Sequence, residues 1–217
     1  MKGLFITFEG PDGSGKTTQL KKLALFLQQA GHSVIVTREP GGTSISDQIR
    51  TIVLSPDNSD MIGQTEVLLY AASRAQHVHE KIIPALLAGQ IVLCDRFIDA
   101  SVAYQAFGSG MEESEVRGIS QFASSGLKPR RTYIIEVPVE VSQRRLLQRG
   151  QSEFHQALDR IEQKGSEYHN RVREAFFQIA KEEPDRICLL NGDRSEDEIF
   201  ADIQTDFLQF FVKYLKK

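Results

Sequence analysis

The chain has 217 residues, of which 41% are hydrophobic and 25% charged, with a formal net charge of −3. This length and composition suit one globular α/β domain over residues 1–217, and the slightly negative charge argues against a nucleic-acid partner. No apolar run reaches transmembrane length, so no membrane partner is expected. Cys94 and Cys188 lie in apolar runs and are expected to be buried and reduced; without a signal-peptide pattern, the expected compartment is the cytoplasm.

The first predicted strand leads directly into a glycine-rich loop. Residues 10–17 read Gly-Pro-Asp-Gly-Ser-Gly-Lys-Thr, a complete G-x-x-x-x-G-K-[ST] pattern between an apolar strand and a helical pattern that ends near Gly31. The glycines let backbone amides surround a phosphate, Lys16 reaches the β- and γ-phosphates, and the Thr17 hydroxyl is placed to ligate Mg²⁺. The expected ATP-binding residues are Gly10, Pro11, Asp12, Gly13, Ser14, Gly15, Lys16, Thr17 and Thr18.

Strands and helices alternate along the rest of the chain. The predicted strands cover residues 5–9, 33–37, 91–94, 132–137 and 187–190. The predicted helices cover residues 64–88, 112–124, a segment after Pro138, 166–182, and a segment from Ser195, where Ser195 and Glu198 form a capping box. This order predicts a doubly wound, parallel five-stranded sheet with helices on both faces. Residues 148–164 are polar and aperiodic, and are expected to form a mobile lid.

Two other predicted strands end in charged sequences. The second ends in Arg38-Glu39-Pro40-Gly41-Gly42-Thr43, and the third runs into Asp95-Arg96. An aspartate that ends a strand beside a phosphate loop is typical of a Mg²⁺-ordering carboxylate, and Arg96 offers a planar fork for a phosphate. Taken alone, Asp95 and Arg96 equally fit a surface ion pair; the nearby loop and the second strand-end arginine favour the functional interpretation.

Tyr70 and Arg74 lie one turn apart on the long predicted helix. Two interpretations fit this spacing. The tyrosine ring could stack on a base while the guanidinium bonds its carbonyl edge, or the ring could pack on the arginine stem. The local sequence does not decide between them.

Five co-linear segments resemble the signature segments of thymidylate kinases. They are residues 8–13 (Phe-Glu-Gly-Pro-Asp-Gly), 38–43, 68–74 (Leu-Leu-Tyr-Ala-Ala-Ser-Arg), 95–97 (Asp-Arg-Phe) and 103–105 (Ala-Tyr-Gln). Residues 159–162 (Asp-Arg-Ile-Glu) are similar to the lid-closing sequence of that family. The resemblance extends over residues 3 to about 190. It implies a P-loop nucleoside-monophosphate kinase, a homodimer, that uses ATP and Mg²⁺ to convert dTMP to dTDP for DNA synthesis.

The resemblance also implies roles on the acceptor side. Asp12 would reach toward the 3′-hydroxyl, Tyr70 would stack on thymine, Arg74 would bond a thymine carbonyl, and Tyr104 would crowd the 2′-position and so disfavour ribose. Arg38 and Arg96 would grip the phosphate, and Ser101 would help to read the base. The implied substrate-binding residues are Arg38, Tyr70, Arg74, Arg96, Ser101, Tyr104 and Gln105; the implied metal ligands are Thr17 and Asp95.

A second transition-state cation must come from outside the loop, because residues 11–14 contain no basic side chain. Family members without a loop arginine carry one on the lid, and Arg149 matches that position best, with Arg160 as the other lid candidate. Arg144 and Arg145 are expected to be solvated helix-surface charges. The implied catalytic residues are Lys16, Arg149, Asp95, Arg96 and Asp12.

The sequence departs from the family pattern in two places. Residues 106–110 read Ala-Phe-Gly-Ser-Gly and lack an arginine usual there, and the lid is longer than in compact bacterial relatives. Two other functions remain as alternatives: a P-loop kinase acting on another acceptor, such as dUMP or deoxyguanosine, and a nucleotide-dependent switch. The switch is disfavoured because no Asn-Lys-x-Asp motif follows the later strands.

Overall fold

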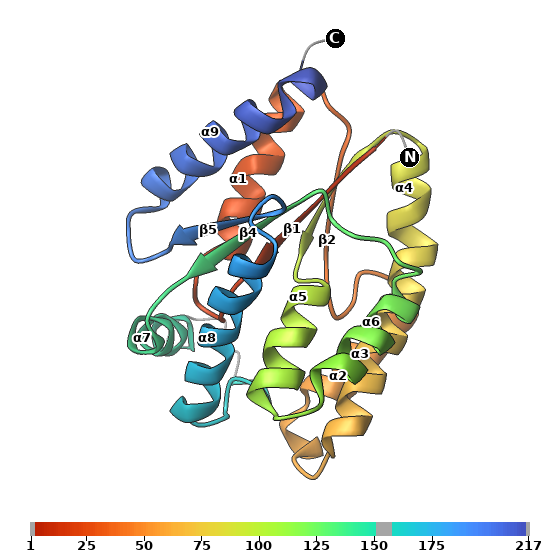
Figure 1. Cartoon of the computed structure of the whole chain (residues 1–217), viewed down its shortest axis with the longest axis vertical. Coiled ribbons are helices and arrows are strands. Elements are labelled where there is room, and N and C mark those ends of the chain that lie inside the picture. Colours follow the sequence, from red (N-terminus) through yellow and green to blue (C-terminus); the bar gives the residue numbers. More distant parts are fainter. Residues whose placement is uncertain (1–2, 151–157, 216–217) are drawn as a thin grey trace.

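A computed structural model describes residues 3–150 and 158–215, and its described strands form one parallel five-stranded sheet (Figure 1). The strands are β1 (Leu4–Glu9), β2 (Val34–Arg38), β3 (Ile91–Asp95), β4 (Arg131–Glu136) and β5 (Ile187–Asn191). Their order in the sheet is β2-β3-β1-β4-β5, and all pairings are parallel. The α/β class and the doubly wound sheet predicted from the sequence are confirmed, with strand ends shifted by at most one residue.

Helices connect these strands. They are α1 (Lys16–Gln29), α2 (Ser44–Leu54), α3 (Gly63–His77), α4 (Ile83–Leu87), α5 (Ile98–Ser101), α6 (Glu113–Ala123), α7 (Val139–Gly150), α8 (Ser166–Glu182) and α9 (Glu196–Leu215). The capping box at the start of α9 is confirmed, since Ser195 and Glu198 exchange side-chain and backbone hydrogen bonds. Two elements were not predicted. One is helix α2; the other is the α5 stretch, which consists of α5 and the π-helical segment Val102–Gly108 that follows it.

The long helix predicted over residues 64–88 is interrupted. A π-helical segment, Val78–Ile82, separates α3 from α4, and Pro84 follows it in the first turn of α4. Proline has no N–H to donate to the preceding turn, and its ring clashes with the carbonyl four residues back, so a regular α-helix cannot pass through this position undisturbed.

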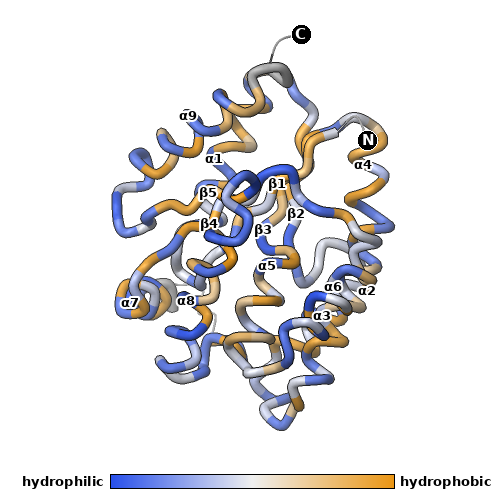
Figure 2. The backbone as a smooth tube through the Cα atoms, in the orientation of Figure 1, coloured by the Kyte–Doolittle hydropathy of each residue, from blue (hydrophilic) through white to orange (hydrophobic). Residues whose placement is uncertain are grey.

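The helices cover both faces of the sheet. On one face α1 packs on β1, β2 and β3, and α9 packs on α1 and β5, through fully buried side chains such as Leu23, Phe8 and Phe207. On the other face, α4 and the π-helical segment before it pack on β1 and β3, while α8 and the α5 stretch pack on β4 and β5. Figure 2 shows apolar and hydrophilic residues alternating along α8 and α9, as expected for helices with one face on a core. No helix among the described residues is long and apolar enough to cross a membrane.

The two cysteines differ in burial. Cys94, on the central strand β3, is fully buried, whereas Cys188, on the edge strand β5, is only half-buried. The expectation that both are buried is therefore wrong for Cys188, because an edge strand leaves part of its surface uncovered.

The strand order brings three chemistry-bearing sequences to one edge of the sheet. Asp95 at the end of β3 pairs in register with Phe8 of β1 on one side and with Arg38 of β2 on the other. The phosphate loop after β1, residues 38–43 after β2, and Asp95-Arg96 after β3 therefore adjoin. This edge is where ligands bind in doubly wound sheets.

Candidate active site

The phosphate loop turns tightly between β1 and α1. Its three glycines have positive φ values: +129° at Gly10, +75° at Gly13 and +94° at Gly15. A Cβ atom on Gly10 would lie 2.1 Å from the carbonyl oxygen of Ile135 on β4, so no larger residue fits there. Gly15 also caps α1. The loop amides and the helix N-terminus together form an anion-binding concavity.

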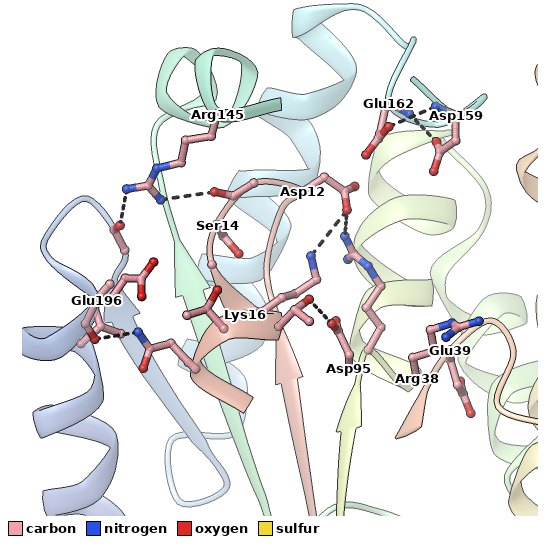
Figure 3. A pocket seen from close by; sticks show the side chains of 18 of the residues that line it. Asp12, Ser14, Lys16, Arg38, Glu39, Asp95, Arg145, Asp159, Glu162 and Glu196 are labelled. Carbon is pink, nitrogen blue, oxygen red and sulfur yellow. Dashed lines mark hydrogen bonds and ion pairs between the residues drawn. The ribbon is translucent and has the colours of Figure 1, made fainter. Parts of the chain in front are cut away.

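Lys16 lies at the start of α1 with only 6% of its surface exposed. Its Nζ donates to the carbonyl of Pro11 at 3.2 Å and lies 3.5 Å from Asp12 Oδ1. The ammonium group is therefore held over its own loop, beside a cavity of about 910 Å³. Figure 3 shows Lys16 and Asp12 facing each other at the mouth of the loop.

Thr17 and Asp95 offer oxygen ligands at the floor of this cavity. The Thr17 hydroxyl donates a hydrogen bond to Asp95 Oδ2. No group of three or more His, Cys, Asp or Glu side chains that could hold a metal exists within the described residues. Two oxygen donors from the chain fit Mg²⁺, because this ion keeps several waters and takes its other ligands from substrate phosphates.

Arg96 links the phosphate loop to Tyr104. Its guanidinium donates to the carbonyl of Gly10 at 3.0 Å, to Asp12 Oδ1 at 2.7 Å and to the Tyr104 hydroxyl at 3.0 Å. The Tyr104 hydroxyl in turn donates to Asp12 Oδ2 at 3.3 Å. Burial alone would raise the pKa of Asp12, but the charges of Arg96 and Lys16 outweigh it and hold that pKa well below its usual value. Asp12 is therefore a carboxylate at neutral pH.

A second, smaller pocket of about 70 Å³ adjoins the first. The two pockets share Asp12 and Arg96 in their walls. The second pocket brings together most of the predicted substrate-binding residues: Tyr70, Arg74, Arg96, Ser101, Tyr104 and Gln105. Arg38 instead lines the larger cavity, where its exposed guanidinium bonds Asp47 at 3.2 Å.

Arg74 is buried and held from all sides. Its Nε donates to Glu39 Oε2 at 2.8 Å. One terminal nitrogen donates to Ser120 Oγ at 3.1 Å, and the other to the carbonyl of Phe97 and to Ser101 Oγ, both at 3.0 Å. Each hydrogen bond fixes the plane of the guanidinium, which therefore presents one orientation to the pocket.

Glu39 is oriented by a chain of hydrogen bonds behind the pocket. Its second oxygen, Oε1, bonds His77 Nδ1 at 3.0 Å, and His77 Nε2 bonds the Thr37 hydroxyl at 2.7 Å. All of these side chains are buried, and they connect β2 with α3. The sequence motif at residues 38–43 thus supplies a carboxylate for Arg74 as well as the cation Arg38.

Comparisons with known proteins agree with this geometry. The Thymidylate kinase family model matches residues 8–203. The chain belongs to the thymidylate kinase family. A thymidylate kinase from Exiguobacterium sibiricum is 50% identical over 217 residues, which is 100% of this chain and 98% of the relative. One from Geobacillus sp. (strain WCH70) is 45% identical over 201 residues, 93% of this chain and 94% of the relative.

A solved structure supports the same family. The crystal structure of thymidylate kinase from Ehrlichia chaffeensis has a TM-score of 0.74 and 30% sequence identity, and the match covers 94% of this chain and 98% of that one. The fold predicted from the sequence, a P-loop kinase, is confirmed by this likeness. As a member of the thymidylate kinase family, the chain is an enzyme and a transferase.

The two predicted lid arginines of this thymidylate kinase family member, Arg160 and Arg149, differ in how much the structure describes of them. Arg160 is 92% buried: its Nη2 donates to Glu66 Oε2 at 2.7 Å, and its Nε donates to the carbonyl of Val53 at 3.0 Å. Gln105 completes the cluster by donating to Glu66 Oε1 at 2.9 Å. Arg160 therefore anchors residues 159–162 to α2 and α3. The side chain of Arg149, near the end of α7, and residues 151–157 of the predicted lid fall outside what the structure describes.

Arg145 differs from its sequence-based interpretation. It is not a solvated surface charge: its guanidinium reaches from α7 across the phosphate loop, donating to the carbonyl of Gly13 at 3.2 Å and of Gly192 at 3.1 Å (Figure 3). Arg144, the preceding residue, is exposed as expected. The spacing along α7 could not distinguish them, because the partners of Arg145 are backbone carbonyls from distant loops.

Sequence reasoning also missed other residues at the site. Arg50 of α2 lines both pockets and donates to the carbonyl of Pro40 at 3.0 Å. Glu39 and Glu66 hold the arginines described above. Away from both pockets, Arg171 of α8 donates to the carbonyl of Gly108 at 2.7 Å, at the end of the π-helical segment and in the stretch that lacks the usual family arginine. Glu39 belongs to the charged segment of residues 38–43, so its motif could have indicated a role at the site. Arg50 and Arg171 could not be found in this way, because no motif marks their helices.

Proposed function

We infer that the chain transfers the γ-phosphoryl group of ATP to dTMP and releases dTDP and ADP, a step toward dTTP for DNA synthesis. Membership in the thymidylate kinase family supports this function. The observation that carries it is the joining of two pockets at Asp12 and Arg96: one is built on a phosphate loop and the other is small and lined by aromatic and arginine side chains.

On the donor side, residues Gly10–Thr18 hold the phosphates of ATP. The loop amides bind phosphate oxygens, and Lys16 offsets the charge that spreads over the transferring group. Thr17 and Asp95 would hold Mg²⁺, which offsets charge on the β- and γ-phosphates when bound.

On the acceptor side, Arg38 and Arg96 hold the phosphate of dTMP. One phosphate oxygen forms a bond to the γ-phosphorus while the bond from that phosphorus to the β,γ-bridging oxygen breaks, so ADP leaves. Asp12 faces the sugar, next to Tyr104, whose ring crowds the 2′-position. Tyr70 stacks on thymine, and Arg74, Ser101 and Gln105 bond its edge or hold the groups that do; all four side chains line the second pocket.

A coupled assay tests the acceptor. The purified chain is given ATP with dTMP, dUMP, dGMP or no acceptor, and ADP release is followed. We expect turnover with dTMP to exceed that with dGMP, because the second pocket measures only about 70 Å³ and a purine is larger than thymine. We expect it to exceed that with dUMP because the chain belongs to the thymidylate kinase family. Faster turnover with dGMP would support the alternative kinase, and equal ADP release without an acceptor would support the switch.

Arg74→Ala should raise the KM for dTMP at least about tenfold and leave the KM for ATP within about twofold, because a site built to hydrogen-bond its ligand depends on that group. Arg74→Lys is the matched control: it keeps the charge and loses the fork, so it should also raise the KM for dTMP. Steady-state kinetics with each substrate varied in turn measures both constants. An equal rise in the two constants, with a lowered Tm, would assign Arg74 to packing alone.

We also propose that the chain forms a homodimer through α2, α3 and α6. These helices pack together and carry apolar side chains that are largely exposed: Ile45 (51%), Ile52 (48%), Leu68 (58%) and Phe122 (87%). Exposed apolar groups that gather on neighbouring helices are typical of protein interfaces, and a two-fold dimer is the commonest soluble assembly.

Leu68→Asp should convert this dimer to a monomer, because it places a charge at the proposed interface. Leu87→Asp is the matched control: Leu87 is 65% exposed but lies on α4, outside that face. Light scattering coupled to size-exclusion chromatography measures both masses. A monomeric wild-type chain, or loss of the dimer in Leu87→Asp alone, would contradict the proposed face.

Two further assignments complete this proposal. The chain acts as a single domain, since every described strand belongs to one sheet. It works in the cytoplasm, where ATP and dTMP are available and where its two unpaired cysteines stay reduced.

A further inference from the structure

Glu9, the last residue of β1, has a fully buried carboxyl group immediately before the phosphate loop. Its Oε1 accepts the backbone N–H of Phe97 at 2.7 Å. Its Oε2 has no hydrogen-bond partner in the part of the chain that the structure describes. Burying a carboxyl group with one unpaired oxygen is costly, so its position calls for a physical explanation.

The residue before Phe97 has an unusual backbone. Arg96 has a φ of +72°, in the left-handed region that side chains with a Cβ rarely adopt. The N–H of Arg96 still extends the sheet by donating to the carbonyl of Phe8 at 2.9 Å. The chain then turns, and the next N–H, that of Phe97, points back to β1, where the side chain of Glu9 accepts it.

This left-handed turn decides where the Arg96 side chain goes. From it, the guanidinium reaches Gly10, Asp12 and Tyr104, the meeting point of the two pockets. A strained conformation at a functional site persists only where neighbouring groups hold it. We propose that Glu9 is a positioning residue for Arg96: its buried side chain accepts the Phe97 amide and so holds the backbone turn that directs the guanidinium toward the acceptor phosphate.

Glu9 acts here on the backbone and not as an ion-pair partner. The hydrogen bonds of the Arg96 guanidinium go to Gly10, Asp12 and Tyr104, and its charge is balanced first by Asp12. Burial, and secondly the charge of Asp99, raise the pKa of Glu9 to about 8, with Asp95 contributing in the same direction and Arg96 in the opposite one. Glu9 is therefore largely neutral and uses one oxygen as an acceptor. Glutamine has the same shape and provides the same acceptor oxygen.

The inference rests on the proposed role of Arg96 in binding the dTMP phosphate, and three variants test it. Glu9→Gln keeps the acceptor oxygen; Glu9→Met keeps the length and removes it; Glu9→Asp keeps the chemistry but is one methylene too short to reach Phe97. We expect Glu9→Gln to leave the KM for dTMP within about twofold of wild type. Glu9→Met and Glu9→Asp should raise it about tenfold, with the KM for ATP within about twofold.

A double-mutant cycle with Arg96→Ala shows whether Glu9 acts through Arg96. If it does, Glu9→Met should add little to the dTMP KM once Arg96 is gone, because residues that share one interaction are not additive. Where Glu9→Met does not fold, Glu9→Asp takes its place in the cycle. Tm values of all variants accompany the kinetics.

Three results would overturn the inference. In the first, Glu9→Met and Glu9→Asp leave the KM for dTMP unchanged while Arg96→Ala raises it. That result would support the role of Arg96 and exclude the role of Glu9. Equal rises in both KM values with a lowered Tm, or an additive cycle, would show a general structural effect. An unchanged dTMP KM in Arg96→Ala would remove the proposed role of Arg96, and this inference with it.

Discussion

Lys16→Ala should lower kcat by about a hundredfold or more, because a fixed cation that meets developing charge in the transition state contributes on this scale. Lys16 is held by its own loop: it is 6% exposed and donates to the carbonyl of Pro11. Little binding energy is therefore spent on ordering the side chain. Initial rates at saturating ATP and dTMP measure the effect.

The matched control for this prediction is Lys21→Ala. Lys21 lies on the same helix, α1, but is exposed to solvent and lines neither pocket. Its removal should leave kcat within about twofold, since exposed charges contribute little. Both variants should keep a wild-type circular dichroism melt. Near-normal turnover in Lys16→Ala would refute the assignment.

Arg149→Ala should lower kcat by about 10³ while changing both KM values little, the mark of an interaction made only in the transition state. Position 149 lies four residues after Arg145 on α7, and residues four apart share a helix face. Arg145 already bonds the carbonyls of Gly13 and Gly192 at the donor cavity. The face of α7 that carries Arg145 therefore packs on the phosphate loop, and the four-residue spacing is the reason for choosing Arg149 in this prediction.

Arg160 gives the decisive contrast. Its guanidinium is engaged with the buried Glu66 and with the carbonyl of Val53, so it is not free to reach a phosphate. Arg160→Ala should instead lower stability, by about 3 kcal/mol, because the buried Glu66 loses its close guanidinium partner and keeps only Lys164, 3.7 Å from the same oxygen. Arg144 is an exposed neighbour on α7, so Arg144→Ala should leave kcat unchanged. If kcat collapses in a folded Arg160→Ala enzyme and survives in Arg149→Ala, the choice of arginine is wrong.

The features predicted best from the sequence are those that depend only on residues close together in the chain. The strands were predicted within one residue because apolar, β-branched runs between turns have few other uses, and the phosphate loop was predicted because glycine spacing and helix start coincide. Helix α2 was missed although Ile45, Ile49, Ile52 and Val53 recur at helical spacing. Ile45 and Ile52 are largely exposed and belong to the face proposed for the dimer, so this stripe does not mark a core-facing helix.

Long-range partners could not be predicted in the same way. That Glu39 faces Arg74, Glu66 faces Arg160, and Glu9 faces the amide of Phe97 depends on how distant elements pack. A buried carboxylate looks the same in a sequence as an exposed one. The local sequence could not show the four hydrogen bonds that hold Arg74, and Arg145 was mistaken for a surface charge for the same reason.

Asp12 belongs to the phosphate loop, yet it also receives Arg96 and Tyr104 from the acceptor side. One carboxylate thus forms part of the wall of both pockets. A ligand that moves it changes the free energy of binding for the other ligand, and thermodynamic linkage makes this effect reciprocal. Whatever factor one nucleotide applies to the dissociation constant of the other, the second must apply to that of the first, through the wall that the two pockets share.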